Sequence, residues 1–128
     1  MKITHVALWC RDLERAVGFW EKYFAALAGP LYASARRPGF VSRFVRLAEG
    51  AELELMSAPW LDDPAPAGAE RAGWAHVAIS LGSEAAVDAL SARLSADGFL
   101  LAAPRHTGDG FYEAVAKDPE GNLIEITG

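Results

Sequence analysis

The chain has 128 residues and is about half hydrophobic, so it can form one compact domain with a core of its own. Its net charge of −5 disfavours a nucleic-acid binder, which needs a basic face, and it has neither a bilayer-length apolar run nor a charged-then-apolar leader. Cys10 is the only cysteine, which excludes an internal disulfide and, without a leader, leads us to expect a cytoplasmic protein.

The first half of the chain shows the patterns of one strand, one helix and three further strands. Apolar residues alternate over 3–9, as in a half-buried strand. Asp12 is suited to cap a helix over 13–27, where apolar residues recur at helical spacing. The further strands are expected at 31–36, 40–47 and 52–56. This order predicts a βαβββ unit.

Residues 58–73 are rich in Pro, Ala and Gly and are predicted to form a linker. Trp60 lies within this linker, where we interpret it as a structural plug rather than as the cover of a pocket. We therefore predict a single domain, 1–128, composed of a first module, 1–57, the linker, and a second module, 74–128.

The second half of the chain repeats the order of elements. A strand is expected over 74–81, and Ser83 is suited to cap a helix over 84–96 that ends at Gly98. The remaining strands are expected at 99–102, 111–117 and 123–127, with a tight turn at 118–121 between the last two.

The two halves also match in sequence at one constant offset. Thr-His-Val-Ala-Leu at 4–8 recurs as Ala-His-Val-Ala-Ile at 75–79, 71 positions later. Glu-Gly-Ala-Glu-Leu-Glu-Leu at 49–55 recurs as Glu-Gly-Asn-Leu-Ile-Glu-Ile at 120–126, again 71 positions later. Two copies are too few for a solenoid, so the matches indicate duplication of one supersecondary unit.

Each half places one histidine on its first strand and one glutamate on its last strand. His5 and Glu54 are 49 positions apart, and so are His76 and Glu125. The residues that flank them in the strands are apolar and should meet the helix, so alternation points all four polar side chains to the helix-free, concave face of the sheet.

Two histidines and two glutamates form a donor set for a metal ion. A buried carboxylate is costly unless it is paired or bound to a metal. Imidazole together with carboxylate suits divalent Ni, Zn, Co, Mn or Fe, and the absence of cysteine ligands disfavours a closed structural zinc site. The sequence therefore predicts that the four side chains converge on one divalent metal ion, with places left for water or substrate.

Two other residues compete for a role in this site. Glu52 shares the face of Glu54, but its counterpart in the second half is Leu123, so Glu54 is preferred as the ligand. His106 lies in a segment flanked by Gly and Pro and has no counterpart in the first half. We interpret it first as a loop residue and second as a substrate contact.

These motifs resemble those of the vicinal oxygen chelate superfamily over essentially the whole chain, most specifically in Asp-Pro-Glu-Gly-Asn-Leu-Ile-Glu-Ile at 118–126. Members of that superfamily include glyoxalase I, methylmalonyl-CoA epimerase, extradiol dioxygenases, fosfomycin-resistance thiol transferases and metal-free bleomycin-binding proteins. The resemblance implies the α+β glyoxalase/bleomycin resistance/dioxygenase fold, with the helices of two βαβββ modules on one side of a curved, cleft-forming mixed sheet. It also implies a homodimer.

The order His-Glu-His-Glu is similar to that of glyoxalase I, position by position. The epimerase carries Gln where Glu54 stands, the dioxygenases and thiol transferases have no protein ligand there, and the bleomycin binders lack the ligands. The resemblance thus implies a lactoylglutathione lyase-like enzyme acting through a metal-bound enediolate. It makes Glu125 the first candidate for the catalytic base and Glu54 its counterpart.

The expected substrate is a small molecule, such as an α-oxo compound or a glutathione or other thiol adduct, and no nucleic-acid or membrane partner is expected. Residues 36–40 and 107–112 are predicted to form loops at the rim of its pocket, although no motif assigns an arginine to the substrate. Two alternatives remain open. One is another metalloenzyme of the superfamily, an epimerase or a dioxygenase, and the other is a non-catalytic small-molecule or antibiotic-binding protein.

Overall fold

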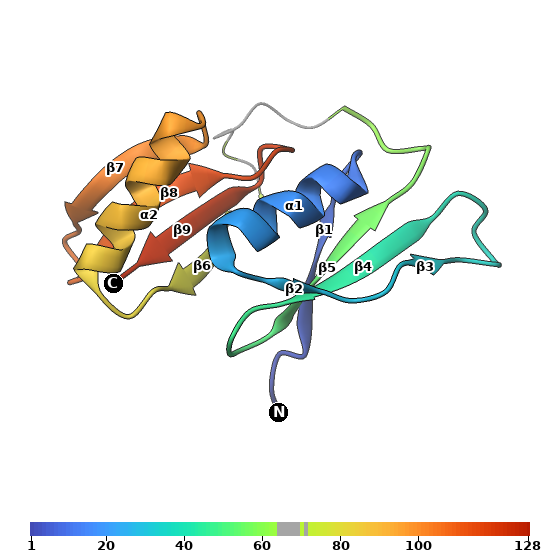
Figure 1. Cartoon of the computed structure of the whole chain (residues 1–128), viewed down its shortest axis with the longest axis horizontal. Coiled ribbons are helices and arrows are strands. Elements are labelled where there is room, and N and C mark those ends of the chain that lie inside the picture. Colours follow the sequence, from blue (N-terminus) through green and yellow to red (C-terminus); the bar gives the residue numbers. More distant parts are fainter. Residues whose placement is uncertain (64–69, 71) are drawn as a thin grey trace. The chain divides into compact units, whose positions relative to one another are not determined.

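The chain folds into two β-rich units, each with one helix (Figure 1). Contacts between residues group it into Met1–Asp63 and Pro64–Gly128. The computed structural model describes residues 1–63, 70 and 72–128, so residues 64–69 and 71 of the predicted linker lie outside the described residues. No helix in these described ranges is long and apolar enough to cross a membrane.

The first unit is a helix packed on one face of a five-stranded sheet. Its elements are β1 (His5–Trp9), α1 (Leu13–Phe24), β2 (Leu27–Ala28), β3 (Tyr32–Ala33), β4 (Val41–Arg46) and β5 (Glu52–Ser57). The strand order is β1-β5-β4-β2, with β3 also paired to β4. Strand β1 runs parallel to β5, and the other pairs are antiparallel.

Helix α1 determines which face of the first sheet is buried. The Asp12 side chain caps it by accepting the Arg15 N–H, as predicted. Its apolar stripe, which includes the fully buried Trp20, covers the sheet on the side where Leu53 and Leu55 of β5 are buried. Because strand residues alternate, the residues between and beside these leucines face away from the helix.

The predicted extent of this helix, 13–27, was too long. Ala25 adopts a left-handed conformation with φ of 50° and ends α1 at Phe24. Leu27 and Ala28 then pair with β4 as strand β2. The strand predicted at 31–36 is reduced to the two residues of β3.

The second unit repeats this arrangement. Its elements are β6 (Val77–Ser80), α2 (Glu84–Ala96), β7 (Leu100–His106), β8 (Tyr112–Lys117) and β9 (Leu123–Thr127). The strand order is β6-β9-β8-β7, with β6 parallel to β9 and the other pairs antiparallel. Strand β9 thus lies between β6 and β8, as β5 lies between β1 and β4. In the first unit β2 and β3 both pair with β4, and together they take the place that β7 has beside β8. The structure thus confirms the α+β class and the duplicated βαβββ unit.

Strand β7 differs from the expectation in length. The strand was predicted at 99–102, but it continues to His106, which pairs with Tyr112 of β8. The register shifts within β7, which the alternation of side chains does not reveal. The interpretation of His106 as a loop residue was therefore wrong: it is the last residue of a strand.

The turn between β8 and β9 fixes the register of the second sheet. The Asp118 carboxylate accepts hydrogen bonds at 2.9 Å from the backbone N–H groups of Glu120 and Asn122 and from the Asn122 side chain. Gly121 has φ of 89°, which glycine adopts without strain. With the turn held in this way, Glu125 of β9 lies opposite Val115 of β8.

Candidate metal centre

The first unit brings His5 and Glu54 together on its helix-free face. His5 opens β1 and Glu54 lies in the middle of β5, beside Ala7 of the parallel strand. A small residue at this neighbouring position leaves room over the sheet for the longer side chains. The His5 Nε2 and a Glu54 carboxylate oxygen are 3.9 Å apart.

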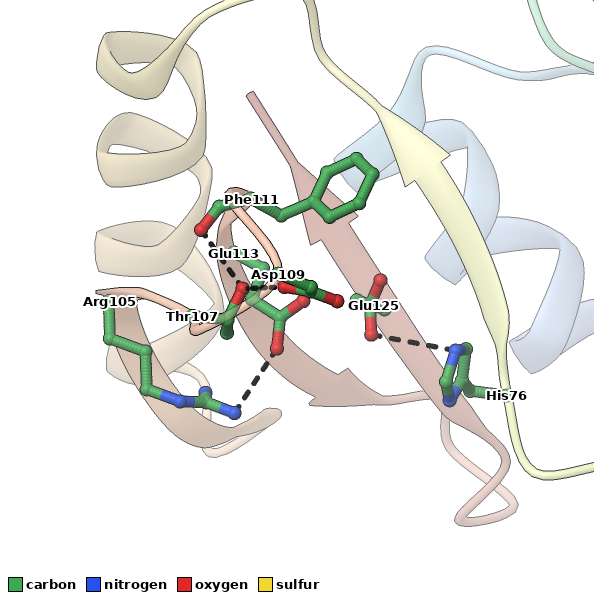
Figure 2. A network of polar contacts seen from close by, with 7 residues as sticks. All are labelled: His76, Arg105, Thr107, Asp109, Phe111, Glu113 and Glu125. Carbon is green, nitrogen blue, oxygen red and sulfur yellow. Dashed lines mark hydrogen bonds and ion pairs between the residues drawn. The ribbon is translucent and has the colours of Figure 1, made fainter.

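The second unit builds the same pair. His76 directly precedes β6, and Glu125 lies in β9 beside Ala78. Figure 2 shows the imidazole and the carboxylate pointing toward each other, with His76 Nε2 at 3.5 Å from Glu125 Oε2. The duplicated sequence has therefore produced a duplicated contact, from equivalent positions on equivalent strands.

The two pairs also agree in their burial. The histidine side chains are 44% and 42% exposed, and their glutamate partners 19% and 20% exposed. Among the residues that the structure describes, neither glutamate forms an ion pair with Lys or Arg. A largely buried carboxylate without a cation is unfavourable in water-poor surroundings. Each pair thus fits half of a divalent-metal site by its donor chemistry.

Glu52 differs from Glu54 because it forms an ion pair with an arginine. It lies directly beside His5 in the sheet, so position alone would admit it as a ligand. However, the Arg46 guanidinium lies 3.7 Å from its carboxylate, and the Glu52 side chain is 42% exposed. Glu52 thus has an arginine partner and a more exposed side chain, and Glu54 has neither.

The orientation of His5 is set by two neighbours. The Thr4 hydroxyl lies 3.3 Å from Nδ1, and the Phe44 ring packs edge-on against the imidazole with centroids 5.5 Å apart. A partner on Nδ1 leaves Nε2 to face Glu54, which is how outer-shell contacts orient histidine ligands. The second unit has Ala75 at the position of Thr4, so this support is specific to His5.

The structure brings the four predicted ligands together as two pairs, one within each unit. In the described part of the chain, no three His, Cys, Asp or Glu side chains form a cluster that could hold a metal ion. Convergence of both pairs on one ion therefore stays a prediction.

A charged pair that the sequence interpretation missed lies on the same face as Glu125. Arg105 of β7 donates to the Glu113 carboxylate of β8 at 3.1 Å (Figure 2). Glu113 is only 8% exposed and lies on a strand that is flanked by β7 and β9, on the face opposite to the buried Ala114 and Ala116. Alternation along β8 could have revealed it, because buried alanines at 114 and 116 place Glu113 and Val115 on the face of Glu125.

The predicted rim loop at 107–112 is a turn closed by side-chain contacts. The Thr107 hydroxyl contacts the Asp109 carboxylate and lies 3.1 Å from the Phe111 carbonyl (Figure 2). The hydrogen bond from Thr107 lowers the pKa of Asp109. At the other end of the turn, the Tyr112 hydroxyl donates to Asp88 of α2 at 2.7 Å, which raises the pKa of Tyr112. These contacts anchor the loop to the second unit.

Comparisons with known proteins show the family and the fold of this chain. A family model described as the Glyoxalase/Bleomycin resistance protein/Dioxygenase superfamily matches residues 2–126. An uncharacterised protein of Pseudomonas aeruginosa is 31% identical over 127 residues, which cover 98% of this chain and 86% of that protein.

Two solved structures show the same fold. A possible glyoxalase from Bacillus cereus is 29% identical, with a TM-score of 0.72 and coverage of 100% of this chain and 99% of that chain. Glyoxalase I from Zea mays is 19% identical, with a TM-score of 0.78. The match covers 98% of this chain but 44% of the maize chain, and at this identity it shows a likeness of fold alone.

Proposed function

Because the chain belongs to the Glyoxalase/Bleomycin resistance protein/Dioxygenase superfamily, we propose that it is a metal-dependent, glyoxalase I-like isomerase or lyase. Its substrate would be a small α-oxo compound or a hemithioacetal formed with glutathione or another thiol. The observation that carries this proposal is the pair of matched His–Glu contacts, His5 with Glu54 and His76 with Glu125.

We propose that these four residues hold one divalent ion, with Ni, Zn, Co, Mn and Fe all compatible with the donors. Such an ion, when bound, would act as a Lewis acid toward two adjacent oxygen atoms of the substrate. The two sheets supply His5, Glu54 and Glu125 from strands and His76 from the residue before β6, which holds their spacing more firmly than long loops would. The glutamate side chains are 19% and 20% exposed, so their contact with bulk water is limited.

The carboxylates would also carry the proton chemistry. Isomerisation of an α-hydroxy carbonyl compound requires a base that removes a proton from one carbon and returns it to the next. We assign this role first to Glu125, with Glu54 as its counterpart. Among the described residues, Glu125 and Glu54 each have a histidine as their charged-group partner, whereas Glu113 and Glu52 are each paired with an arginine.

Three further points belong to the proposal. The active assembly would be a homodimer located in the cytoplasm, and its partner would be a small molecule rather than a nucleic acid or a membrane. A fourth carboxylate at Glu54 favours an isomerase over a dioxygenase, since oxygen would need an open position on the metal. The presence of paired ligands favours an enzyme over a pure binding protein.

One experiment tests the proposed function in two steps. The metal content of the purified protein is measured, and its thermal unfolding is followed with and without chelator. Conversion of the methylglyoxal–glutathione adduct and of other thiol adducts is then measured with each metal added back. A chelator-sensitive melting temperature and metal-dependent conversion are expected. If the purified protein contains no metal and its melting temperature is the same with and without chelator, the proposal is wrong. Metal binding without conversion of any adduct would support a binding protein instead.

A further inference from the structure

The first unit carries an aromatic cluster, which we define as Trp9 and Tyr32 of the sheet, Phe40 directly before β4, and Trp60 in the turn beyond β5. The Trp9 and Phe40 rings meet edge to face with centroids 6.0 Å apart, and Tyr32 meets Phe40 at 6.5 Å. The guanidinium carbon of Arg37 lies 5.1 Å from the Phe40 ring centre and 5.0 Å from that of Trp60. One cation thus connects Trp60 to the rest of the cluster.

The aromatic cluster begins close to the proposed metal ligands. Trp9 lies in β1 on the same face as His5, and its neighbour Met56 in β5 is two residues beyond Glu54. Two residues along a strand span about 7 Å. A ring attached to a substrate whose oxygens lie at the His5–Glu54 pair would therefore reach Trp9.

The cluster leaves much of its aromatic surface open. Trp9 is 42% exposed, Tyr32 is 55% exposed and Trp60 is 48% exposed. Trp60 was expected to be a structural plug, but its exposure and its contact with Arg37 place it at an open rim. Phe40, which joins Trp9 and Tyr32, is itself buried, so the three exposed rings surround a fixed aromatic centre. Exposed aromatic surface beside a polar site is typical of a place where a ligand binds.

The fold itself does not require these aromatic residues. Ser80 of β6 and Thr127 of β9 pair in the second unit as Trp9 and Met56 pair in the first. The second unit thus builds the same sheet with small polar residues where the first has an indole and a thioether. Since duplicated folds keep what packing needs, the aromatic residues of the first unit are better explained by a ligand.

Arg37 adds a charge to this surface. In the described ranges of the chain it contacts two rings but no carboxylate, and its side chain is exposed. The rings hold the guanidinium plane while leaving its N–H groups available to an anion. A ligand that fits this surface would have a flat ring with a negative charge at its outer end.

We propose that the aromatic cluster and Arg37 form a subsite for an anionic aromatic substituent of the substrate. The inference rests on the proposed function, because it assumes that two adjacent oxygens of the same substrate lie at the His–Glu pairs. It goes further by assigning the substrate class: an aryl compound is preferred over a small aliphatic one. Trp9 packs against the ring, and Arg37 binds the charge.

The test uses the full chain loaded with Ni²⁺ and three α-hydroxy acids that share one pair of adjacent oxygens. Calorimetric titrations compare lactate, 3-phenyllactate and 3-(4-carboxyphenyl)lactate. The phenyl ring should raise affinity by up to about tenfold, as an aromatic contact does, and the added carboxylate should raise it further. Trp9→Ser should abolish the gain from the ring without changing the affinity for lactate.

Matched variants separate the two parts of the subsite. Arg37→Met should abolish only the gain from the carboxylate, and Tyr32→Ser, at an exposed position outside the core, should reduce the gain from the ring without unfolding the protein. Trp9→Ser has its own precedent in Ser80, so a native circular dichroism spectrum is expected. Leu101→Ser removes an exposed apolar side chain from the second unit and should leave all three affinities unchanged.

Two results would separate this inference from the proposed function. If lactate binds but the ring adds no affinity, or adds the same affinity in Trp9→Ser, the subsite is wrong and the metal site stands. If chelation leaves the affinity for lactate unchanged but the gain from the ring still depends on Trp9, the metal site is wrong and the subsite stands.

Discussion

The Nε2 atom of His76 lies 3.5 Å from a carboxylate oxygen of Glu125, and this contact reproduces that of His5 with Glu54 at 3.9 Å. In both units an alanine of the first strand lies beside the glutamate of the last strand, so the histidine side chain can lean over it. The parallel register is the reason for the likeness. The exposed fractions of the two histidine side chains are nearly equal, and so are those of the two glutamate side chains, as expected for equivalent positions of a repeat.

Equivalent positions should make equivalent contributions to metal binding. We expect His5→Ala and His76→Ala to lower the affinity for Ni²⁺ by similar factors, each larger than the roughly 10- to 100-fold that loss of an outer-shell partner costs. Isothermal titration of each variant measures this directly. A large loss in one variant alone would show that only one unit builds the site.

Thr4 offers a milder version of the same test. Its hydroxyl lies 3.3 Å from Nδ1 of His5, and the second unit has no counterpart. Thr4→Ala should therefore lower metal affinity by about 10-fold, the lower end of the range for outer-shell partners, without changing the melting temperature of the metal-free protein. Unchanged affinity would mean that Phe44 packing alone orients the imidazole.

Ion pairing distinguishes the two glutamates of β5. Glu54 has no cation in the described part of the chain, whereas Glu52 is paired with Arg46 at 3.7 Å. We expect Glu54→Ala to weaken metal binding strongly and Glu52→Ala to leave it within about twofold, since exposed ion pairs contribute little. The metal content of both variants after dialysis is the measurement. Equal loss in both would indicate that the carboxylate beside His5 in the register is also a ligand.

The sequence predicted the two His–Glu contacts better than it predicted the edges of the fold. The repeat offset and strand alternation were enough to place His5 with Glu54 and His76 with Glu125, because both depend only on local periodicity and on one parallel pairing. Helix α2 begins and ends at the predicted residues, since Ser83 caps it and Gly98 follows it. Whether both pairs meet at one ion depends on contacts that periodicity does not encode.

Other features arose from interactions distant in sequence. Helix α1 ends at Phe24 because Leu27 and Ala28 form backbone hydrogen bonds with β4 instead of continuing the helix. The local sequence pattern does not predict this strand pairing. The continuation of β7 to His106 depends on pairing with β8 across register shifts. The Arg105–Glu113 pair depends on that same pairing: alternation along β8 could place Glu113 on the face of Glu125, but it could not place Arg105 beside Glu113.

Asp118 predicts a pH dependence of stability. Burial raises the pKa of this carboxyl, and hydrogen bonds from Asn122 and Glu120 only partly offset the effect. The folded protein therefore binds this proton more tightly than the unfolded chain does. The contribution of Asp118 to the free energy of unfolding should fall as pH rises from the ordinary pKa of 3.8 through the raised one.

The measurement for Asp118 is urea unfolding of the parent and of Asp118→Asn at a series of pH values. The variant cannot titrate at this position, so the difference between the two free energies isolates the carboxyl. The parent should gain stability relative to the variant as pH falls through the window above 3.8. A difference that instead grows as pH rises would mean that the hydrogen bonds, rather than burial, dominate at this turn.

The assignment of Glu125 as the base makes the last prediction. Glu125→Gln keeps the size of the side chain and an oxygen that can bind a metal, but an amide cannot accept a proton at neutral pH. Proton transfer should therefore fall by about 10²- to 10⁴-fold while most of the metal remains bound. Glu54→Gln is the matched control, because it makes the same chemical change at the equivalent position of the other unit. We expect it to keep more activity than Glu125→Gln.

The assay follows exchange of the carbon-bound proton of the methylglyoxal–glutathione adduct with solvent deuterium by NMR, which reports proton removal whatever the final product. If Glu125→Gln exchanges this proton as fast as the parent, Glu125 is not the base. A reversed order, with Glu54→Gln the slower variant, would move the base to the first unit.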